Sequence, residues 1–251
     1  MKRLIFVTCM TLFLAGCGKK GNLVPPEALR PAPIADLRVG QQGERLLVSW
    51  SRPAREEGGG ALRDLAGFRL FRRELLPPGE DCEECPNAYR LVATVDLEYP
   101  QGVTIRDGRF IFPDDAPAAG KGYRYKVVSS KRDGTLSLDS NRAGKKKVSP
   151  PLPPTVKAVS SPSGIQLDWQ APAVSAGGRI EGYNVYRRRG TDGTYLTPLN
   201  GAPLRETTFE DTRLERGVRY RYGVRTVAVV EGETVESDLS TEVEGALTEP
   251  E

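Results

Sequence analysis

The side chains with the most reactive chemistry in this 251-residue sequence are Cys82 and Cys85, in the run Cys82-Glu83-Glu84-Cys85. Two thiols at this spacing can form a redox dithiol, a metal clip or a small disulfide. A structural zinc site usually needs four Cys or His ligands, and a reactive thiolate needs nearby cations or a helix N-terminus. The loop offers the opposite environment, four acidic residues: Glu80, Asp81, Glu83 and Glu84. We therefore expect a disulfide that shapes a surface loop more than it stabilises a domain.

Other catalytic chemistry is poorly represented. The sequence contains no histidine, which excludes Ser-His and Cys-His pairs, imidazole bases and histidine metal ligands. The carboxylate pairs Asp114-Asp115 and Glu210-Asp211 each follow a strand aromatic, so we expect a shared structural position for them. No phosphate loop, nucleophile elbow or calcium-loop spacing is present. We expect no enzyme activity, no cofactor and no metal. The formal net charge of +3 does not predict a nucleic-acid partner.

The elements that position these residues come in two copies. Four segments recur in the same order: 46–50 as 165–169, 66–73 as 181–188, 112–115 as 209–212, and 122–127 as 219–224. The recurring segments alternate apolar with polar residues, which is typical of half-buried strands. In 219–228, for example, we expect Tyr220, Tyr222, Val224, Thr226 and Ala228 on the buried face. The sequence therefore predicts two all-β domains.

Each copy resembles a fibronectin type III domain. The resemblance rests on a proline-rich lead-in, Trp50 or Trp169 in the second strand, and a Gly-aromatic-x-aliphatic third strand. Residues 214–220 also match the tyrosine-corner pattern, whereas the first copy matches it more loosely and carries a longer insertion. The resemblance implies two tandem immunoglobulin-like (fibronectin type III) β-sandwiches over 32–147 and 152–247. A short linker, 148–151, would join them, and 248–251 would form a tail.

On one sheet of each predicted sandwich, an aromatic residue among cations points away from the core. If Phe68 and Leu70 face inward, then Phe71 and Arg73 face outward, and the second copy repeats the arrangement. An anionic partner would suit such a face. The alternative is a normal sheet face covered by cation–π stacking and long apolar stems. The candidate partner-binding residues are Phe71, Arg73, Lys126, Tyr186, Arg188, Arg221 and Arg225.

The first residues have the pattern of a secretory signal peptide, 1–16. Lys2 and Arg3 precede an apolar run at 4–15 that is shorter than the ~20 residues needed to span a bilayer. The sequence Leu14-Ala15-Gly16-Cys17 then resembles the bacterial lipobox. The resemblance implies cleavage before Cys17, a diacylglyceryl thioether on its sulfur, and an acylated (palmitate-type) amine that anchors the chain in the membrane. Gly18 rather than Asp at the next position favours the outer membrane. The alternative is an ordinary signal peptide with a chance cysteine.

Residues 17–31 are expected to be a flexible, lipidated tether. Glycine and proline are so dense over 18–27 that neither helix nor strand is predicted. The start of this segment resembles the N-terminal motif of LptM-type lipoproteins, which associate with the lipopolysaccharide translocon. The matching residues are Cys17, Gly18, Lys20, Gly21, Leu23, Pro25 and Pro26. The alternative is a generic lipoprotein tether with basic residues near acidic headgroups.

These features together predict a non-catalytic, lipid-anchored envelope protein that binds a partner protein or a surface through its tandem domains. One alternative is an accessory lipoprotein of the lipopolysaccharide translocon. A second is a glycan-binding accessory module. Fold class alone does not choose among these functions.

Overall fold

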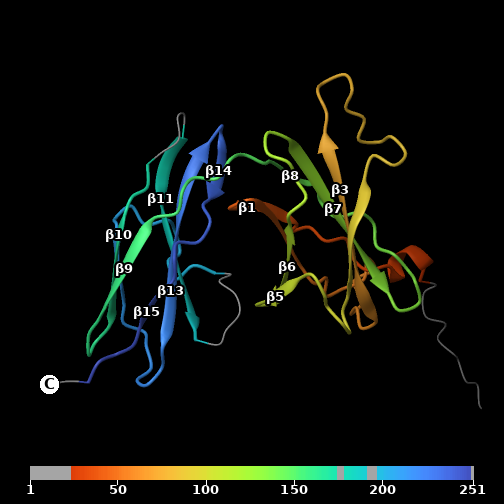
Figure 1. The fold of residues 1–251 in the computed structure, drawn as a ribbon. Coiled ribbons are helices and arrows are strands. Elements are labelled where there is room, and N and C mark those ends of the chain that lie inside the picture. Colours follow the sequence, from red (N-terminus) through yellow and green to blue (C-terminus); the bar gives the residue numbers. More distant parts are fainter. Residues whose placement is uncertain (1–23, 174–177, 191–196, 250–251) are drawn as a thin grey trace, which may run out of the picture.

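The computed structural model describes residues 24–173, 178–190 and 197–249. Within these ranges the chain forms two successive β-sandwiches, and the one helical element is a single 3₁₀ turn, η1 (Pro26–Leu29) (Figure 1). The expected all-β fold class is therefore confirmed. We name the unit built from β1 to β8 domain 1, and the unit built from β9 to β15 domain 2.

Domain 1 is a sandwich of two antiparallel sheets. One sheet has the spatial order β1 (Arg38–Gln42), β2 (Arg45–Ser51), β6 (Arg109–Asp114) and β5 (Thr104–Arg106). The facing sheet has the order β4 (Arg90–Asp96), β3 (Leu65–Leu75), β7 (Gly122–Lys131) and β8 (Ala143–Lys146). The insertion that contains Cys82 and Cys85 connects β3 to β4.

Domain 2 repeats this plan with fewer strands. Its smaller sheet has the order β12 (Thr208–Asp211), β10 (Ile165–Gln170) and β9 (Thr155–Ser160). The facing sheet pairs β11 (Gly178–Arg189) with β13 (Tyr220–Val230), whose far edge is shared by β14 (Glu233–Glu236) and β15 (Val243–Gly245).

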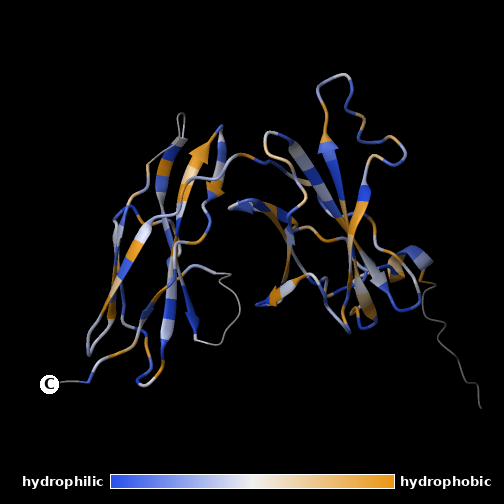
Figure 2. Cartoon of the chain, viewed as in Figure 1, coloured by the Kyte–Doolittle hydropathy of each residue, from blue (hydrophilic) through white to orange (hydrophobic). Residues whose placement is uncertain are grey.

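Each sandwich has its own core around one tryptophan. Trp50 is fully buried and stacks on Phe110 with ring centroids 5.9 Å apart, while Trp169 meets Tyr183 edge to face at 5.4 Å. The two hydrophobic clusters share no residue. Apolar and polar residues alternate along the strands (Figure 2), which is how a sandwich fills its interior and keeps a solvated exterior. The predicted inward residues of the third strands, Phe68 and Tyr183 among them, are buried as expected.

Both sandwiches close the same polar corner. The hydroxyl of Tyr220 accepts a hydrogen bond from the backbone N–H of Glu215 at 3.0 Å, as its sequence pattern predicts. The corner also forms in domain 1, where Tyr123 accepts from the backbone N–H of Ala118 at 2.8 Å. The looser pattern of the first copy therefore does not prevent the bond, because the donor is a main-chain group.

A buried carboxylate is also duplicated. Asp114 accepts hydrogen bonds from Arg72 at 2.7 and 2.8 Å and from the hydroxyl of Tyr125 at 2.9 Å. In domain 2, Asp211 accepts from Arg187 and Tyr222, both at 2.8 Å. Burial, followed by the adjacent carboxylate, raises the pKa of each of these two tyrosines. The repeated acidic positions are therefore structural, as the sequence comparison predicts.

The tether departs from expectation at its described end. Pro26–Leu29 forms the 3₁₀ turn η1, although 18–27 was expected to lack helix. The carbonyl of Ala28 accepts from the N–H of Gly58 at 2.8 Å, and the ammonium of Lys131 donates to the carbonyl of Leu29 at 3.2 Å. The partners of this segment, a loop residue and the last residue of β7, lie far along the sequence, so local composition did not predict the turn.

The two sandwiches share one continuous sheet. A parallel bridge pairs Gln42 at the end of β1 with Glu236 at the end of β14, which joins the β1–β2–β6–β5 sheet of domain 1 to β11–β13–β14 of domain 2. In Figure 1, β1 lies between the two sandwiches, on the side of domain 1 opposite to η1. An open sheet edge accepts another strand readily, and here each domain uses one edge on the other.

Candidate interaction surfaces

The outer face of the β3–β7–β8 sheet gathers four cations, three of which lie against the ring of Tyr89. We call the group formed by Phe71, Arg73, Tyr89, Arg124, Lys126 and Arg142 the domain 1 face. The ammonium of Lys126 lies 4.6 Å from the centroid of the Tyr89 ring, and the guanidinium carbons of Arg142 and Arg73 lie at 5.4 and 5.8 Å. Lys126 also lies 5.5 Å from the ring of Phe71. The expected combination of aromatic rings and cations is therefore present in domain 1.

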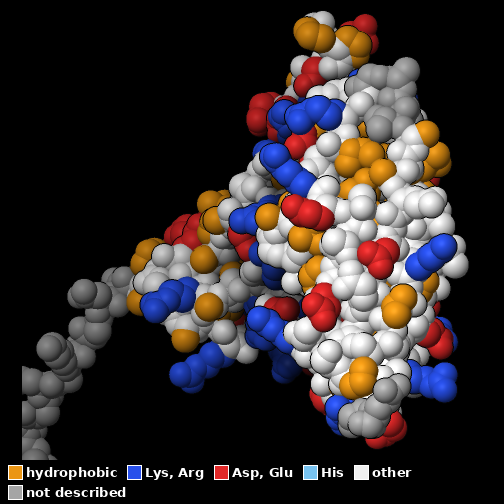
Figure 3. All heavy atoms as spheres, turned by 90° about the vertical axis from the view of Figure 1, so that its left-hand side faces the viewer, with side chains coloured by type: hydrophobic (Ala, Val, Ile, Leu, Met, Phe, Trp, Pro, Cys, Tyr) orange, Lys and Arg blue, Asp and Glu red, His pale blue; other side chains and the backbone are white. Residues whose placement is uncertain are grey.

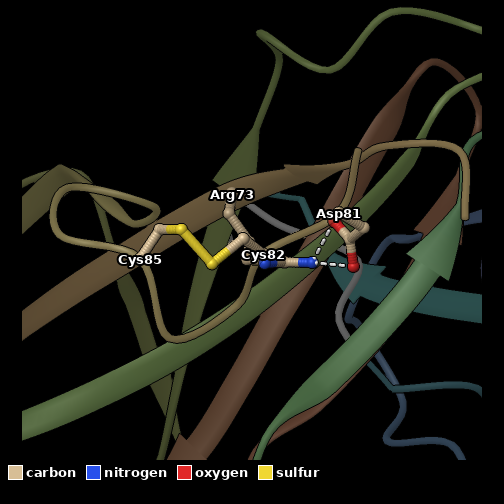
Figure 4. The surroundings of a disulfide bond; sticks show 4 residues. All are labelled: Arg73, Asp81, Cys82 and Cys85. Atoms are coloured by element: carbon tan, nitrogen blue, oxygen red, sulfur yellow. Dashed lines mark hydrogen bonds and ion pairs between the residues drawn. A yellow bond between two sulfur atoms is a disulfide. The ribbon is translucent and has the colours of Figure 1, made fainter. Parts of the chain in front are cut away.

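The acidic loop at 80–85 covers this face. Asp81 forms a two-oxygen ion pair with Arg73, which reaches it from β3 past Cys82 (Figure 4). Glu83 pairs with Arg124 and accepts from Nε of Arg142 at 3.1 Å. Thus two of the four carboxylates that surround the cysteine pair in the sequence, Asp81 and Glu83, bind cations of this face.

The loop contacts shift the ionisation of the groups involved. Hydrogen bonding from Tyr89, whose hydroxyl donates at 2.6 Å, and the neighbouring arginines lower the pKa of Glu83 to about 2. Burial, and then Glu83 itself, raises the pKa of Tyr89 to about 12. The backbone N–H of Leu76 and then Arg73 lower the pKa of Asp81. Glu83 is therefore a carboxylate at neutral pH, and Tyr89 stays protonated as its donor.

Cys82 and Cys85 form a disulfide with an S–S distance of 2.02 Å (Figure 4). This confirms the expected disulfide. The bond closes the loop immediately after Asp81, and Glu83 lies inside the closed segment.

One part of the expected exposed face is wrong. Arg73 was expected to point into solvent, but it is only 4% exposed because the insertion lies over it. Phe71 and Lys126 are half-buried, and Lys126 donates to Asp139 at 3.0 Å. The face of the sheet to which these side chains point was predicted correctly. The cover supplied by the loop at 80–85 was not predicted.

The equivalent face of domain 2 is covered differently. Tyr186, which corresponds to Phe71, was expected to be outward and accessible, but it is only 1% exposed. Its hydroxyl donates to Glu236 at 2.8 Å and accepts from Gln42 of domain 1 at 3.3 Å, and burial raises its pKa. Arg225 lies 5.6 Å from the Tyr186 ring and donates to the carbonyl of Ser237. Val227, expected on the outer side of β13, is buried as well and borders the β1–β2 edge of domain 1.

The remaining predicted cations of domain 2 are ion-paired. Arg188 binds Glu242 at 2.8 Å, and Arg221 binds Glu244 at 2.7 Å. Figure 3 views the molecule toward domain 2 and shows acidic and basic side chains interspersed over that face. Arg188 and Arg221 therefore form ion pairs within domain 2.

The junction between the domains is a polar cluster around Glu236. Its carboxylate accepts from Gln42 at 2.8 Å and from Asn184 as well as Tyr186, and its carbonyl accepts from the N–H of Gly43 at 2.9 Å. At the rim, Lys145 and Lys146 bind acidic residues of the β13–β14 hairpin at 2.8 and 2.7 Å. A cavity of ≈ 530 Å³ flanks this cluster, between Leu47 on one side and Leu239 on the other.

The linker is held as well. The side-chain amide of Gln41 donates to the carbonyl of Val148 at 2.7 Å and accepts from its N–H at 3.1 Å. Val148 is buried. A side chain of β1 thus holds the main chain at the start of the linker.

The sequence interpretation missed several residues of these surfaces, namely Gln42, Glu83, Tyr89, Arg142 and Glu236. The prediction used repeated positions on β3 and β11 and on β7 and β13, and none of these five residues lies at such a position. The acidic run at 80–84 was recognised, but it was interpreted only for its effect on the thiols.

Cys17 and the lipoprotein-like segment before Val24 lie outside the described residues. Within the described ranges, no helix is long and apolar enough to cross a membrane. No group of three or more Cys, Asp or Glu side chains in those ranges is arranged to hold a metal ion.

A match to a family model supports the fold of the second sandwich. Residues 149–243 match the family model described as Fibronectin type III domain. A similar solved structure is the crystal structure of the chicken CNTN1 FN1-FN3 domains, at 20% sequence identity and a TM-score of 0.32. That similarity covers 86% of this chain and 65% of the chicken chain. The second sandwich thus matches the fibronectin type III family, and the immunoglobulin-like sandwich of that family is the fold of this protein.

Proposed function

We propose that this protein is a non-catalytic interaction protein, anchored in the outer membrane of the cell envelope through lipidated Cys17. Its tandem sandwiches present fixed surfaces to a partner protein. Its fibronectin type III fold supports this role, because sandwich domains of this kind carry function on their faces, edges and loops.

The observation that carries the proposal is the junction. A partner that binds two surfaces at once gains affinity only when their spacing suits it. Here the Gln42–Glu236 bridge, the ion pairs of Lys145 and Lys146 and the clamp on Val148 hold the two domains in one arrangement. Such a body presents a composite surface without the entropic cost of ordering a flexible linker.

The anchor is tested by changing its acyl acceptor. We expect Cys17→Ser to move the protein from the membrane fraction to the soluble fraction, since two or three acyl chains are needed for stable anchoring. The unmodified protein should also incorporate labelled palmitate, and Cys17→Ser should not; an unmodified protein that takes up no label would exclude the lipid anchor.

The partner is tested by crosslinking the tagged full-length protein in cells and identifying the products by mass spectrometry. A control variant replaces residues 19–24 with a Gly/Ser linker of equal length, which keeps η1 and its contacts intact. We expect the same crosslinked partners in both forms, with crosslinks on the sandwiches. Loss of partners in the control would assign binding to the short segment and favour the translocon-accessory alternative.

A further inference from the structure

The domain 1 face holds carboxylates that the sandwich itself does not supply. Arg73 and Arg124 lie on neighbouring strands, yet their acidic partners come from the β3–β4 insertion. In domain 2 the corresponding cations Arg188 and Arg221 are paired by acidic residues close to or within the last strand of the same sheet. Lys126 and Arg142 also pair with Asp139 of the sandwich, at 3.0 and 3.1 Å, so the added segment fills the part of the face formed by Arg73 and Arg124.

The site receives two carboxylates that are separated by one residue in the sequence. Asp81 binds Arg73 on β3, and Glu83 binds Arg124 on β7 together with the hydroxyl of Tyr89. Arginine beside carboxylate, with a tyrosine hydroxyl as an extra donor, is the chemistry by which proteins recognise acidic segments. The ring of Tyr89 makes cation–π contacts with Lys126 and Arg142.

The loop is an incomplete and loosely connected occupant. Nε of Arg73 is buried and has no hydrogen-bond partner, so one donor of the face is unused. The backbone hydrogen bonds that the described structure gives to residues 76–89 outside the strands are short-range, from Glu80 to Pro77 and from Ala88 to Cys85. Side-chain contacts therefore attach the loop to the face. An ion-paired cover of this kind can be exchanged for another acidic segment.

We propose that the domain 1 face is a binding site for an acidic protein segment in which one residue separates two carboxylates. The loop at 80–85 occupies this site when no such segment is bound. The disulfide keeps the loop short and close to the face. This inference rests on the proposed function as an interaction protein and names one of its surfaces and the chemistry of the partner.

The test compares two variants with the same change of charge in the same loop. Asp81→Asn with Glu83→Gln removes the two carboxylates that bind the face. Glu80→Gln with Glu84→Gln removes two exposed carboxylates of the same loop that have no ion pair or side-chain hydrogen bond in the described structure. The probe is a synthetic peptide with the sequence of residues 79–87, with serine in place of both cysteines. Its affinity for the full-length protein in detergent is measured by calorimetry at low salt.

We expect the Asp81→Asn/Glu83→Gln protein to bind the peptide about 10-fold more tightly than the Glu80→Gln/Glu84→Gln protein, because a tethered occupant competes at high effective concentration. Adding Arg124→Gln to the first variant should abolish the gain. Equal affinities for the two charge-matched variants, no binding by either, or a gain that survives Arg124→Gln would each overturn the proposal.

Two further measurements keep the outcome interpretable. If Asp81→Asn/Glu83→Gln fails to fold, Cys82→Ser/Cys85→Ser loosens the loop without changing its charge, and peptide binding should rise about 3-fold over the unmodified protein. No rise would overturn the proposal. If the peptide fails to bind while crosslinks to a cellular partner persist on the sandwiches, this inference falls and the proposed function stands. Loss of both would remove the proposed function.

Discussion

The outer faces of the two sandwiches begin with the same plan and end with different covers. In domain 1, Phe71 and its neighbouring cations lie under an acidic loop of the same domain. In domain 2, Tyr186 at the corresponding position lies under Glu236 and Gln42, so the other domain is part of the cover. The first face can be opened by moving one loop, whereas the second can be opened only by separating the domains. A repeated pattern on two strands therefore fixes the direction of a side chain but not what covers it.

The interiors of the two sandwiches, unlike their outer faces, have the same contacts in both domains. The tryptophan, the tyrosine corner and the Arg-Asp-Tyr network are present in both domains with nearly the same distances. Mutations inside the sandwiches should therefore have equal effects in the two copies, and mutations on the faces should not. The following predictions test this contrast, from the largest expected effect to the smallest.

The largest effects should follow loss of the buried carboxylates. Asp114→Ala and Asp211→Ala each leave a half-buried arginine and a buried tyrosine hydroxyl without their partner, and each should lower the free energy of unfolding of its own domain by about 3–5 kcal/mol. Since each domain has one tryptophan, urea unfolding followed by fluorescence reports domain 1 in a Trp169→Phe background and domain 2 in a Trp50→Phe background.

The matched control is Asp115→Ala, which removes only an exposed pair with Arg45 and should change stability by less than about 0.5 kcal/mol. Losses in the two domains that differ by more than about 2 kcal/mol would contradict the equivalence of the interiors.

The next effect should appear at the junction. Glu236→Ala removes the acceptor of Gln42, Asn184 and Tyr186, and should remove about 2–3 kcal/mol of stabilisation. Because this stabilisation couples the domains, the urea midpoints of Trp50 and Trp169 should move apart, and the radius of gyration from X-ray scattering should increase. Glu244→Ala, on the same edge but paired within domain 2, should leave both properties unchanged. If Glu236→Ala leaves the midpoints together, the bridge does not couple the domains.

A smaller effect is expected from the disulfide. Cys82→Ser/Cys85→Ser should lower the stability of domain 1 by no more than about 2 kcal/mol, because a very short closed loop restricts the unfolded chain little. Domain 2 should keep its urea midpoint. A larger loss, or any transfer of the effect to Trp169, would show that the loop supports more than the domain 1 face.

The smallest effect is confined to the loop and depends on pH. The pKa of Glu83 is lowered from 4.5 to about 2 in the folded protein, so its contacts add stability above about pH 4.5 and lose it as the pH falls toward 2. The side-chain NMR signals of Tyr89, the hydrogen-bond donor to Glu83, should change over this range without unfolding of the β3–β7 sheet. In Glu83→Gln this change of the Tyr89 signals should be absent. A loop that titrates unchanged in that variant would assign the pH dependence to another group.

The sequence predicted the sandwiches well because their determinants are local. A period of two buries Phe68 and Tyr183, and turn residues separate the strands. It did not predict the burial of Arg73 and Tyr186, because their covers lie outside the repeated strands. The 3₁₀ turn at Pro26–Leu29 was missed for a related reason, since the carbonyl of Ala28 accepts from Gly58 and that of Leu29 from Lys131, both far along the chain.

The bridge between β1 and β14 also sets an order of events during synthesis of the chain. β1 is the first strand in the described part of the chain, and the residue that pairs with its edge, Glu236, lies 194 positions after Gln42. Domain 1 can therefore form its core long before its edge has a partner, and during that interval the strand can pair with another molecule. The sequence of β1, Arg-Val-Gly-Gln-Gln, carries a charge, a glycine and two amides, which make such pairing less favourable. In a newly made chain, β14 of domain 2 therefore covers the edge of β1 late, and the edge is then no longer open to pairing with another molecule.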